Sequence, residues 1–307
     1  MQARVKGSIR MKLQHVGVCG CGLMGAGIAE VVARAGYPVV VLEATNELCE
    51  RGLGSITRSL DKLVSKSLLP ADEKLAIVNR LRATVDPSEL AHCDLIIEAI
   101  VEDLDAKKKL WRALDPHLKK DAILASNTSS LSIREMMTAT SRPERFVGLH
   151  FFNPVPLMSL VEASKSDRTD PEVYRAALEF VAVLGKTAVE VSDRPGFIVN
   201  RLLIPYLLDA VRVLEQRVAT IADIDQAMKL GCGYPMGPFV LMDLIGIDTT
   251  VSIANILFAQ LAEPRFAPPA LLRRMVAAGW LGRKSGQGFY DYADRNSPKP
   301  QDELLLS

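Results

Sequence analysis

Short apolar runs alternate with amphipathic stretches along most of the first 190 residues of the chain. The apolar runs lie at residues 15–19, 39–42, 94–101, 122–126 and 146–149. Short runs without polar alternation are typical of strands that are buried on both faces of a parallel sheet. The stretches at residues 46–67 and 104–114 instead place apolar residues at helical spacing. The pattern predicts an α/β fold with helices on both sides of a mostly parallel sheet.

The pattern changes after Val191, where the cluster Ser192-Asp193-Arg194-Pro195-Gly196 is typical of a linker. Strand-like runs stop beyond it, and helical spacing follows at residues 197–214, 221–230, 239–245, 248–261 and 270–278. Pro205 lies inside the first of these helices and predicts a kink or a local repair. We therefore expect an α/β domain over residues 1–192 and an all-helical domain over residues 193–307.

A glycine-rich turn joins the first apolar run to the amphipathic stretch after it. It has the sequence Gly20-Cys21-Gly22-Leu23-Met24-Gly25. The first glycine of such a turn permits a tight bend, the second lets the main chain approach a pyrophosphate, and the third lets the helix pack closely on the strand. The N-terminus of that helix would direct N–H groups at the phosphates.

Glu43 ends the second apolar strand, 18 residues after Gly25, where a carboxylate can accept hydrogen bonds from a ribose. An ordinary turn between a strand and a helix is the alternative, but the strand, the helix and the acid together favour a dinucleotide site. A 2′-phosphate would be repelled by the carboxylate of Glu43, and the nearest arginine in the sequence is Arg51. We therefore expect NAD rather than NADP.

One histidine, His150, is expected at the carboxyl end of a strand, where open α/β sheets place their ligands. A histidine is more often a packed or surface residue than a catalytic one. Glu162, on the following strand, favours the catalytic interpretation, because a hairpin would set the imidazole against the carboxylate. The carboxylate would fix the tautomer and let His150 accept a proton.

Ser129 and Asn200 are weaker candidates from the residues alone. Ser129 would equally serve as the cap of a following helix, and Asn200 as an ordinary residue of the first helix after the linker. A hydroxyl and an amide are both suited to bond a reacting hydroxyl or carbonyl oxygen.

Composition narrows the classes of protein further. The chain has 307 residues, of which 49% are apolar and 24% charged, and its formal net charge is +1. Such a charge gives no broad field that attracts nucleic acid or an acidic membrane. The five cysteines include no C-x-x-C pair, so we expect no disulfide framework and no metal. No run of about 18 apolar residues occurs, and the basic start lacks the apolar stretch of a signal peptide, so we expect a cytoplasmic protein.

Six segments together resemble the L-3-hydroxyacyl-CoA dehydrogenase family, over about residues 13 to 292 and most closely its stand-alone bacterial type. They are GCGLMGAGIA, IIEAIVED, LASNTSSLSI, RFVGLHFFNPVPLMSLVE, PGFIVNRLLIPYLLDA and DIDQAMKLGCGYPMGPF. The resemblance implies a Rossmann-like N-terminal domain, a helical C-terminal domain, NAD as the cofactor and an acyl-CoA as the substrate. The implied reaction is the reversible oxidation of a (3S)-3-hydroxyacyl-CoA, of short chain such as 3-hydroxybutanoyl-CoA, to the 3-ketoacyl-CoA.

The resemblance also implies roles for individual residues. His150 would be the catalytic base and Glu162 its partner, while Ser129 and Asn200 would contact the substrate oxygen. The implied cofactor contacts are Gly20, Cys21, Gly22, Leu23, Met24, Gly25, Glu43, Glu102, Lys107, Ser129, Asn153 and Lys284. The implied substrate contacts are Ser129 and, for coenzyme A, Ser59 and Lys66, which share one helix face. Members of the family dimerise through the helical domain, so a homodimer is expected.

Two positions depart from the family pattern: Glu43 stands where aspartate is commoner, and Cys21 where alanine is. Two other functions stay open. One is a related dehydrogenase that acts on a sugar acid such as L-gulonate, and the other is a non-catalytic nucleotide-binding protein on the same fold. The HFFNPVPLMSLVE segment favours the thioester over the sugar acid. The complete set of candidate catalytic residues argues against a non-catalytic protein.

Overall fold

The computed structural model describes residues 13–294 and 296–302. Residues 1–12, which form most of the basic start discussed above, lie outside the described part. The chain divides into two compact units, Met1–Arg194 and Pro195–Ser307, and the division falls in the linker-like cluster.

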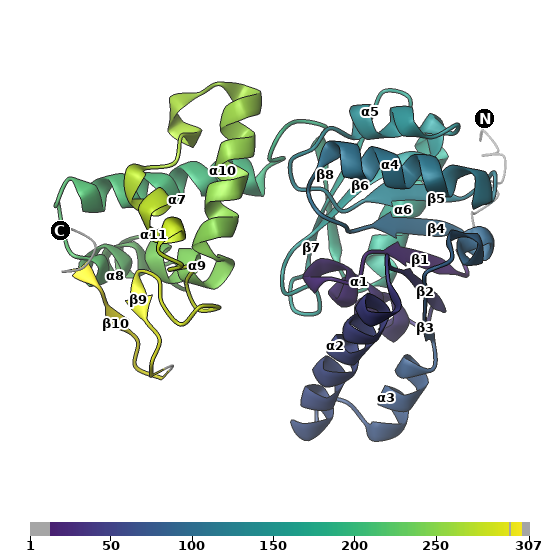
Figure 1. The fold of residues 1–307 in the computed structure, drawn as a ribbon, viewed down its shortest axis with the longest axis horizontal. Helices are drawn as coiled ribbons and strands as arrows, with labels where there is room; N and C mark the ends of the chain where they lie inside the picture. Colours follow the sequence, from purple (N-terminus) through teal and green to yellow (C-terminus); the bar gives the residue numbers. More distant parts are fainter. Residues whose placement is uncertain (1–12, 295, 303–307) are drawn as a thin grey trace, which may run out of the picture. The chain divides into compact units, whose positions relative to one another are not determined.

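The first unit is built on an eight-stranded, mostly parallel sheet (Figure 1). Its strands are β1 (Val16–Cys19), β2 (Val39–Leu42), β3 (Leu81–Thr84), β4 (Leu95–Glu98), β5 (Ile123–Ser126), β6 (Phe146–Phe151), β7 (Leu160–Lys165) and β8 (Thr187–Ser192). The strand order is β3-β2-β1-β4-β5-β6-β7-β8. The pairs from β3 to β6 are parallel, β7 runs antiparallel to β6, and β8 runs parallel to β7. The expected Rossmann-like class with a mostly parallel sheet is confirmed.

Helices cover both faces of this sheet (Figure 1). They are α1 (Leu23–Arg34), α2 (Asn46–Ser65), α3 (Ala71–Val78), α4 (Leu104–Leu114), α5 (Ile133–Met136) and α6 (Pro171–Val183). Side chains of α1, α2 and α6 belong to one hydrophobic cluster, and side chains of α4 and α5 belong to another. Successive side chains of a strand point to opposite faces, so Leu95 and Ile97 join the first cluster while Ile96 joins the second. This explains why the strands are continuous apolar runs in the sequence.

The second unit packs its helices around a core of its own. They are α7 (Val199–Glu215), α8 (Ile221–Cys232), α9 (Pro238–Ile245), α10 (Ile247–Leu261) and α11 (Ala270–Ala277). Helix α7 continues through Pro205. The expectation of an all-helical domain needs one correction, because β9 (Tyr290–Asp291) and β10 (Lys299–Pro300) form an antiparallel pair. Each of these strands has two residues, which is too short for an alternating pattern to be recognised.

A buried aspartate ties the segment around β9 to the helices of the second unit. Asp243, on α9, accepts hydrogen bonds from the main chain of Phe289 and Tyr290, both at 3.0 Å, and from the hydroxyl of Tyr292 at 2.9 Å. Its side chain is buried, and this burial raises its pKa to about 6, although the three donors act in the opposite direction. The carboxylate therefore binds the C-terminal segment to α9, although removing its charge from water is unfavourable.

Among the described residues, no single helix has the length and apolar character needed to cross a bilayer. The bent pair α9 and α10 has both only when the two helices are taken together, by length and composition alone.

Candidate active site

The glycine turn lies between β1 and α1 and depends on its glycines at two points. Gly20 has a φ of +90°, and a Cβ on it would lie 2.9 Å from the carbonyl oxygen of Ala99. A Cβ on Gly25 would lie 1.8 Å from the carbonyl oxygen of Gly20, so the helix reaches the strand only without a side chain there. Apart from Gly22 itself and its two chain neighbours, no described residue has a heavy atom within 4 Å of the position that a Cβ on Gly22 would take. The middle of the turn is therefore open to a ligand.

The residues next to these glycines have different surroundings. Leu23 and Met24 begin α1, the first exposed and the second half-buried. Cys21 is buried, and burial first, then the charge of Glu43, raises the pKa of its thiol to about 12. A Cβ on Gly52 of α2 would lie 2.4 Å from the sulfur of Cys21, so α2 packs directly on this side chain. The thiol of Cys21 is thus a neutral packing group near neutral pH.

Glu43 follows β2, and its carboxylate lies against the glycine turn. Its Oε1 accepts the main-chain N–H of Cys21, and its Oε2 accepts that of Ala44 at 3.2 Å. The side chain is half-buried, so part of the carboxylate stays accessible. An acceptor is therefore fixed beside an open turn at a helix N-terminus, and this arrangement fits the ribose and pyrophosphate of a dinucleotide.

His150 and Glu162 meet across the hairpin that β6 and β7 form. They are direct partners in the antiparallel register, and 2.8 Å separates His150 Nδ1 from Glu162 Oε2. His150 is 7% exposed and Glu162 is 1% exposed. The ring of Phe152 lies 4.3 Å from the imidazole, measured between centroids. A carboxylate at Nδ1 holds the proton on that nitrogen and directs the chemistry of the imidazole to Nε2.

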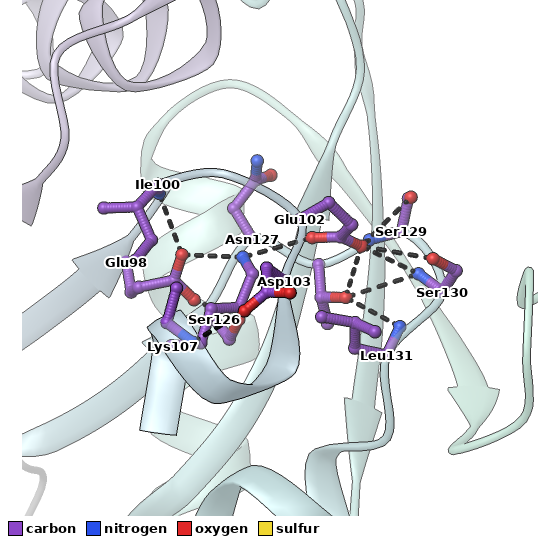
Figure 2. A network of polar contacts seen from close by, with 12 residues as sticks. Glu98, Ile100, Glu102, Asp103, Lys107, Ser126, Asn127, Ser129, Ser130 and Leu131 are labelled. Atoms are coloured by element: carbon purple, nitrogen blue, oxygen red, sulfur yellow. Dashed lines mark hydrogen bonds and ion pairs between the residues drawn. The ribbon is translucent and has the colours of Figure 1, made fainter. Parts of the chain in front are cut away.

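Ser129 lies in the loop that follows β5, and the carboxylate of Glu102 holds this loop (Figure 2). Glu102 Oε1 accepts from Thr128 Oγ1 at 2.7 Å and from the main-chain N–H of Ser129 at 2.8 Å. The hydroxyl of Ser129 lies farther from the same oxygen, at 3.2 Å. Burial by itself would raise the pKa of Glu102, but Lys107 and the donors of the loop together lower it below its ordinary value. The loop is therefore organised around an ionised carboxylate.

Lys107, an implied cofactor contact, lies inside the protein. Its side chain has 0% exposure, and its ammonium lies 2.6 Å from Glu98 Oε1 and 3.1 Å from Glu102 Oε2. In this arrangement Lys107 reaches a ligand only through Glu102, and a direct contact with the cofactor stays a prediction. Glu98 was visible in the sequence as a charge within an apolar run, but no role follows from that observation alone.

The other candidates in the first unit lie in three different settings. Asn153 is exposed, two residues beyond the end of β6. Ser59 is half-buried on α2, close to the carboxylate of Glu30 on α1. Lys66 is exposed at the C-terminal cap of α2. The contacts that these residues are expected to make with NAD or coenzyme A stay predictions.

Two candidates belong to the second unit. Asn200 is buried in the first turn of α7, with 8% exposure. Lys284 pairs with Asp248 of α10, with 2.6 Å between its ammonium and Oδ1. Their roles in binding substrate and cofactor stay predictions.

The described residues of the glycine turn and Glu43 are suited to bind a dinucleotide, and the described residues form no metal centre. Gly22 leaves space over the turn, α1 presents its N-terminus, and Glu43 supplies the acceptor for a ribose. Among the residues that the structure describes, no group of three or more histidine, cysteine, aspartate or glutamate side chains is arranged to hold a metal ion.

The fold and the glycine turn define an NAD-binding enzyme, and the comparison with known families names it more closely. Residues 15–194 match the 3-hydroxyacyl-CoA dehydrogenase NAD binding domain, and residues 196–292 match the C-terminal domain of the same enzymes. The chain belongs to the 3-hydroxyacyl-CoA dehydrogenase family, and NAD is its cofactor.

Individual relatives agree with this assignment over nearly their whole length. A 3-hydroxybutyryl-CoA dehydrogenase of Bradyrhizobium diazoefficiens is 45% identical over 280 residues, which cover 91% of this chain and 96% of that protein. One of Mycobacterium tuberculosis is 47% identical over 282 residues, which cover 91% of this chain and 99% of the other. The crystal structure of M. tuberculosis FadB2 has a TM-score of 0.90 at 47% identity and covers 92% of this chain and 99% of its own.

Proposed function

We propose that this protein catalyses the reversible NAD-dependent oxidation of a (3S)-3-hydroxyacyl-CoA to the 3-ketoacyl-CoA, with 3-hydroxybutanoyl-CoA as its substrate. The preference for a four-carbon acyl group is supported by the relatives described above, which are named 3-hydroxybutyryl-CoA dehydrogenases. The observation that supports the mechanism best is the buried pair of His150 and Glu162, with 2.8 Å between Nδ1 and Oε2.

In this proposal His150 is the general base. Its Nε2 takes the proton of the C3 hydroxyl, while NAD, when bound, accepts the hydride from C3. Glu162 stabilises the imidazolium that forms and keeps the ring in one tautomer. In the reverse direction the imidazolium returns its proton to the alkoxide. Ser129 and Asn200 are the proposed hydrogen-bond partners of the reacting oxygen.

The two units have different roles in this proposal. The first unit binds NAD through the glycine turn and Glu43, with Glu102 and Asn153 as further contacts. Ser59 and Lys66 of the same unit contact coenzyme A. The second unit supplies Asn200 and Lys284.

The proposal is tested by following the oxidation of NADH with acetoacetyl-CoA, beside the reduction of NAD with L-gulonate. We expect turnover of the thioester and no measurable turnover of the sugar acid. A higher kcat/KM for gulonate would support a sugar-acid dehydrogenase, and inactivity on both would support a non-catalytic nucleotide-binding protein. A series of thioesters from four to sixteen carbons then tests the proposed preference for a short chain.

We also propose that the second unit forms a homodimer. It exposes large apolar side chains, including Leu202 at 68%, Leu230 at 75% and Phe258 at 41%, which are suited to an interface. Symmetric dimers are the commonest oligomers of soluble proteins. Light scattering at micromolar concentration should give a dimer mass, and a monomer mass would contradict the proposal.

A cytoplasmic location is proposed as well. Cys19, Cys21, Cys49 and Cys93 are buried free thiols, which fit a reducing compartment. Cell fractionation that recovers the protein outside the cytoplasm would overturn this proposal.

A further inference from the structure

Glu98 is a charged residue in a place where the sequence and the packing favour an apolar one. It ends β4, directly after Leu95, Ile96 and Ile97, and its side chain has 0% exposure. Removing a carboxylate from water is costly unless hydrogen bonds and a counter-charge compensate for the loss of hydration. An apolar residue would fill the same space without this cost. The role of Glu98 must therefore lie in the hydrogen bonds and the ion pair that its carboxylate makes.

Both oxygens of Glu98 are used. Oε1 accepts from the ammonium of Lys107 at 2.6 Å and from the main-chain N–H of Ile100 at 2.8 Å. Oε2 accepts from the hydroxyl of Ser126 at 2.5 Å. Ser126 is the last residue of β5, so one oxygen of Glu98 faces the start of α4 and the other faces the loop that carries Ser129.

Lys107 connects Glu98 to the second carboxylate of the network, that of Glu102 (Figure 2). The distance from its ammonium is 2.6 Å to Glu98 and 3.1 Å to Glu102. A fully buried ammonium between two carboxylates is shared by both, and the closer contact with Glu98 limits how far it can move towards Glu102. The position of Glu102 therefore depends on Glu98.

Glu102 passes this restraint to the loop after β5. Its Oε1 is close to five donors of Thr128, Ser129 and Ser130, more than the lone pairs of one oxygen can satisfy. The shortest contacts are those to Thr128 Oγ1 at 2.7 Å and to the N–H of Ser129 at 2.8 Å, so these fix the main chain. The hydroxyl of Ser129, at 3.2 Å, can exchange this contact for one with a substrate.

A second connection runs from Glu98 towards His150. The main-chain carbonyl oxygen of Glu98 accepts the N–H of Asn127 at 2.7 Å. The side-chain oxygen of Asn127 then accepts the N–H of Phe151 at 2.8 Å. Phe151 directly follows His150 in β6, so the residue at the end of β4 is linked to both His150 and Ser129, which are proposed to contact the substrate oxygen.

We propose that Glu98 is a positioning residue for the dehydrogenase reaction, which sets Ser129 through Lys107 and Glu102. The proposal rests on the proposed function, in which Ser129 bonds the reacting oxygen. Replacing Glu98 by Gln keeps the shape and removes the charge, so the ammonium of Lys107 moves to Glu102 alone. The carboxylate of Glu102 then turns towards Lys107 and releases the main chain at Ser129.

The test compares Glu98→Gln, Glu102→Gln and the double variant in the NADH-dependent reduction of acetoacetyl-CoA. We expect Glu98→Gln to lower kcat about tenfold with less than about threefold change in KM, because a misplaced partner weakens the transition state more than the bound substrate. When Glu98→Gln is added to Glu102→Gln, kcat should fall by less than about a further twofold, because Glu98 acts on Ser129 through Glu102. An equal loss in both backgrounds would overturn the proposal.

A second measurement distinguishes a positioning role of Glu98 from a general effect on stability. It also gives a result that does not depend on the proposed dehydrogenase activity. Hydrogen exchange at residues 127–131 should become faster in Glu98→Gln, whether or not the wild-type protein reduces acetoacetyl-CoA. The matched control is Asp115→Asn, which removes a partly buried partner of Arg142, 3.0 Å away. We expect the control to lower Tm without changing kcat or the exchange of the loop. Unchanged exchange and kcat in Glu98→Gln would contradict the proposal. A similar loss of kcat and a similar increase in exchange in Asp115→Asn, at an equal loss of Tm, would also contradict it.

If Glu98→Gln fails to fold, Glu98→Gln combined with Lys107→Met removes both buried charges together. The double change also frees Glu102, so the same tenfold loss of kcat and the same faster exchange are expected. Wild-type values of both in this variant would overturn the proposal.

Discussion

His150 and Glu162 are directly paired across the antiparallel β6–β7 ladder, and their side chains meet with 2.8 Å between Nδ1 and Oε2. Directly opposed residues of such a ladder point to the same face of the sheet, so the register alone brings the two groups together. Both strands are buried at this point, and a one-residue slip would turn the imidazole and the carboxylate to opposite faces. The core of the first unit thus maintains the pairing.

Glu162→Gln should lower kcat by roughly 100-fold or more, because the amide keeps the contact with Nδ1 but no longer stabilises the imidazolium. KM for acetoacetyl-CoA should change little. Glu190→Gln, which alters an exposed carboxylate on the neighbouring strand β8, is the control and should retain wild-type kcat. Steady-state kinetics that show the same kcat for Glu162→Gln and the control would remove Glu162 from the mechanism.

Glu43→Ala should narrow the preference for NAD over NADP, chiefly by weakening NAD. The unmodified enzyme should prefer NAD by at least about tenfold in kcat/KM, equivalent to about 1.4 kcal/mol, because the carboxylate accepts from the ribose and repels a 2′-phosphate. Glu47→Ala, in the exposed first turn of α2, serves as the control. A kcat/KM with NADPH that equals or exceeds that with NADH in the unmodified enzyme would refute this assignment.

The stability of the second unit should depend on pH through Asp243. Its pKa is about 6 in the folded protein, against an ordinary value of 3.8, so the folded state binds more protons between these values. The contribution of Asp243 is therefore present at acid pH and is lost as the pH rises through about 6, by at most about 3 kcal/mol. Asp243→Asn should remove this decrease.

Urea unfolding between pH 4 and pH 7 measures the effect, followed by the fluorescence of Trp280 in a Trp111→Phe background. The difference in free energy of unfolding between the Asp243 protein and its Asn variant should fall as the pH rises. A difference that is independent of pH would show that the carboxylate titrates alike in the folded and unfolded states.

The sequence predicted those parts of the site that depend on local spacing. The glycine turn and Glu43 lie within one strand–helix–strand segment. The structure has no room for a side chain at Gly20 or Gly25, as the spacing predicted. The contact of His150 with Glu162 was also predictable, because a hairpin brings nearby strands into pairing.

Other features depend on contacts between distant parts of the chain. The bond between Ser126 and Glu98 spans 28 residues, and that between Ser129 and Glu102 spans 27, so these contacts could not be predicted from local spacing. The pattern also did not single out β3 and β8, because both are partly exposed edge strands rather than continuous buried runs. Helix α6 was missed as well.

The measurement that tests the central claim most directly is the kcat of His150→Gln with acetoacetyl-CoA and NADH, together with the Kd of NADH. Glutamine keeps a polar side chain of similar size but cannot act as a general base near neutral pH. We predict a kcat lower by roughly 10²–10⁴-fold and a Kd of NADH within about twofold of the wild-type value. A variant that keeps most of the wild-type kcat would contradict the proposed role of His150 as the catalytic base.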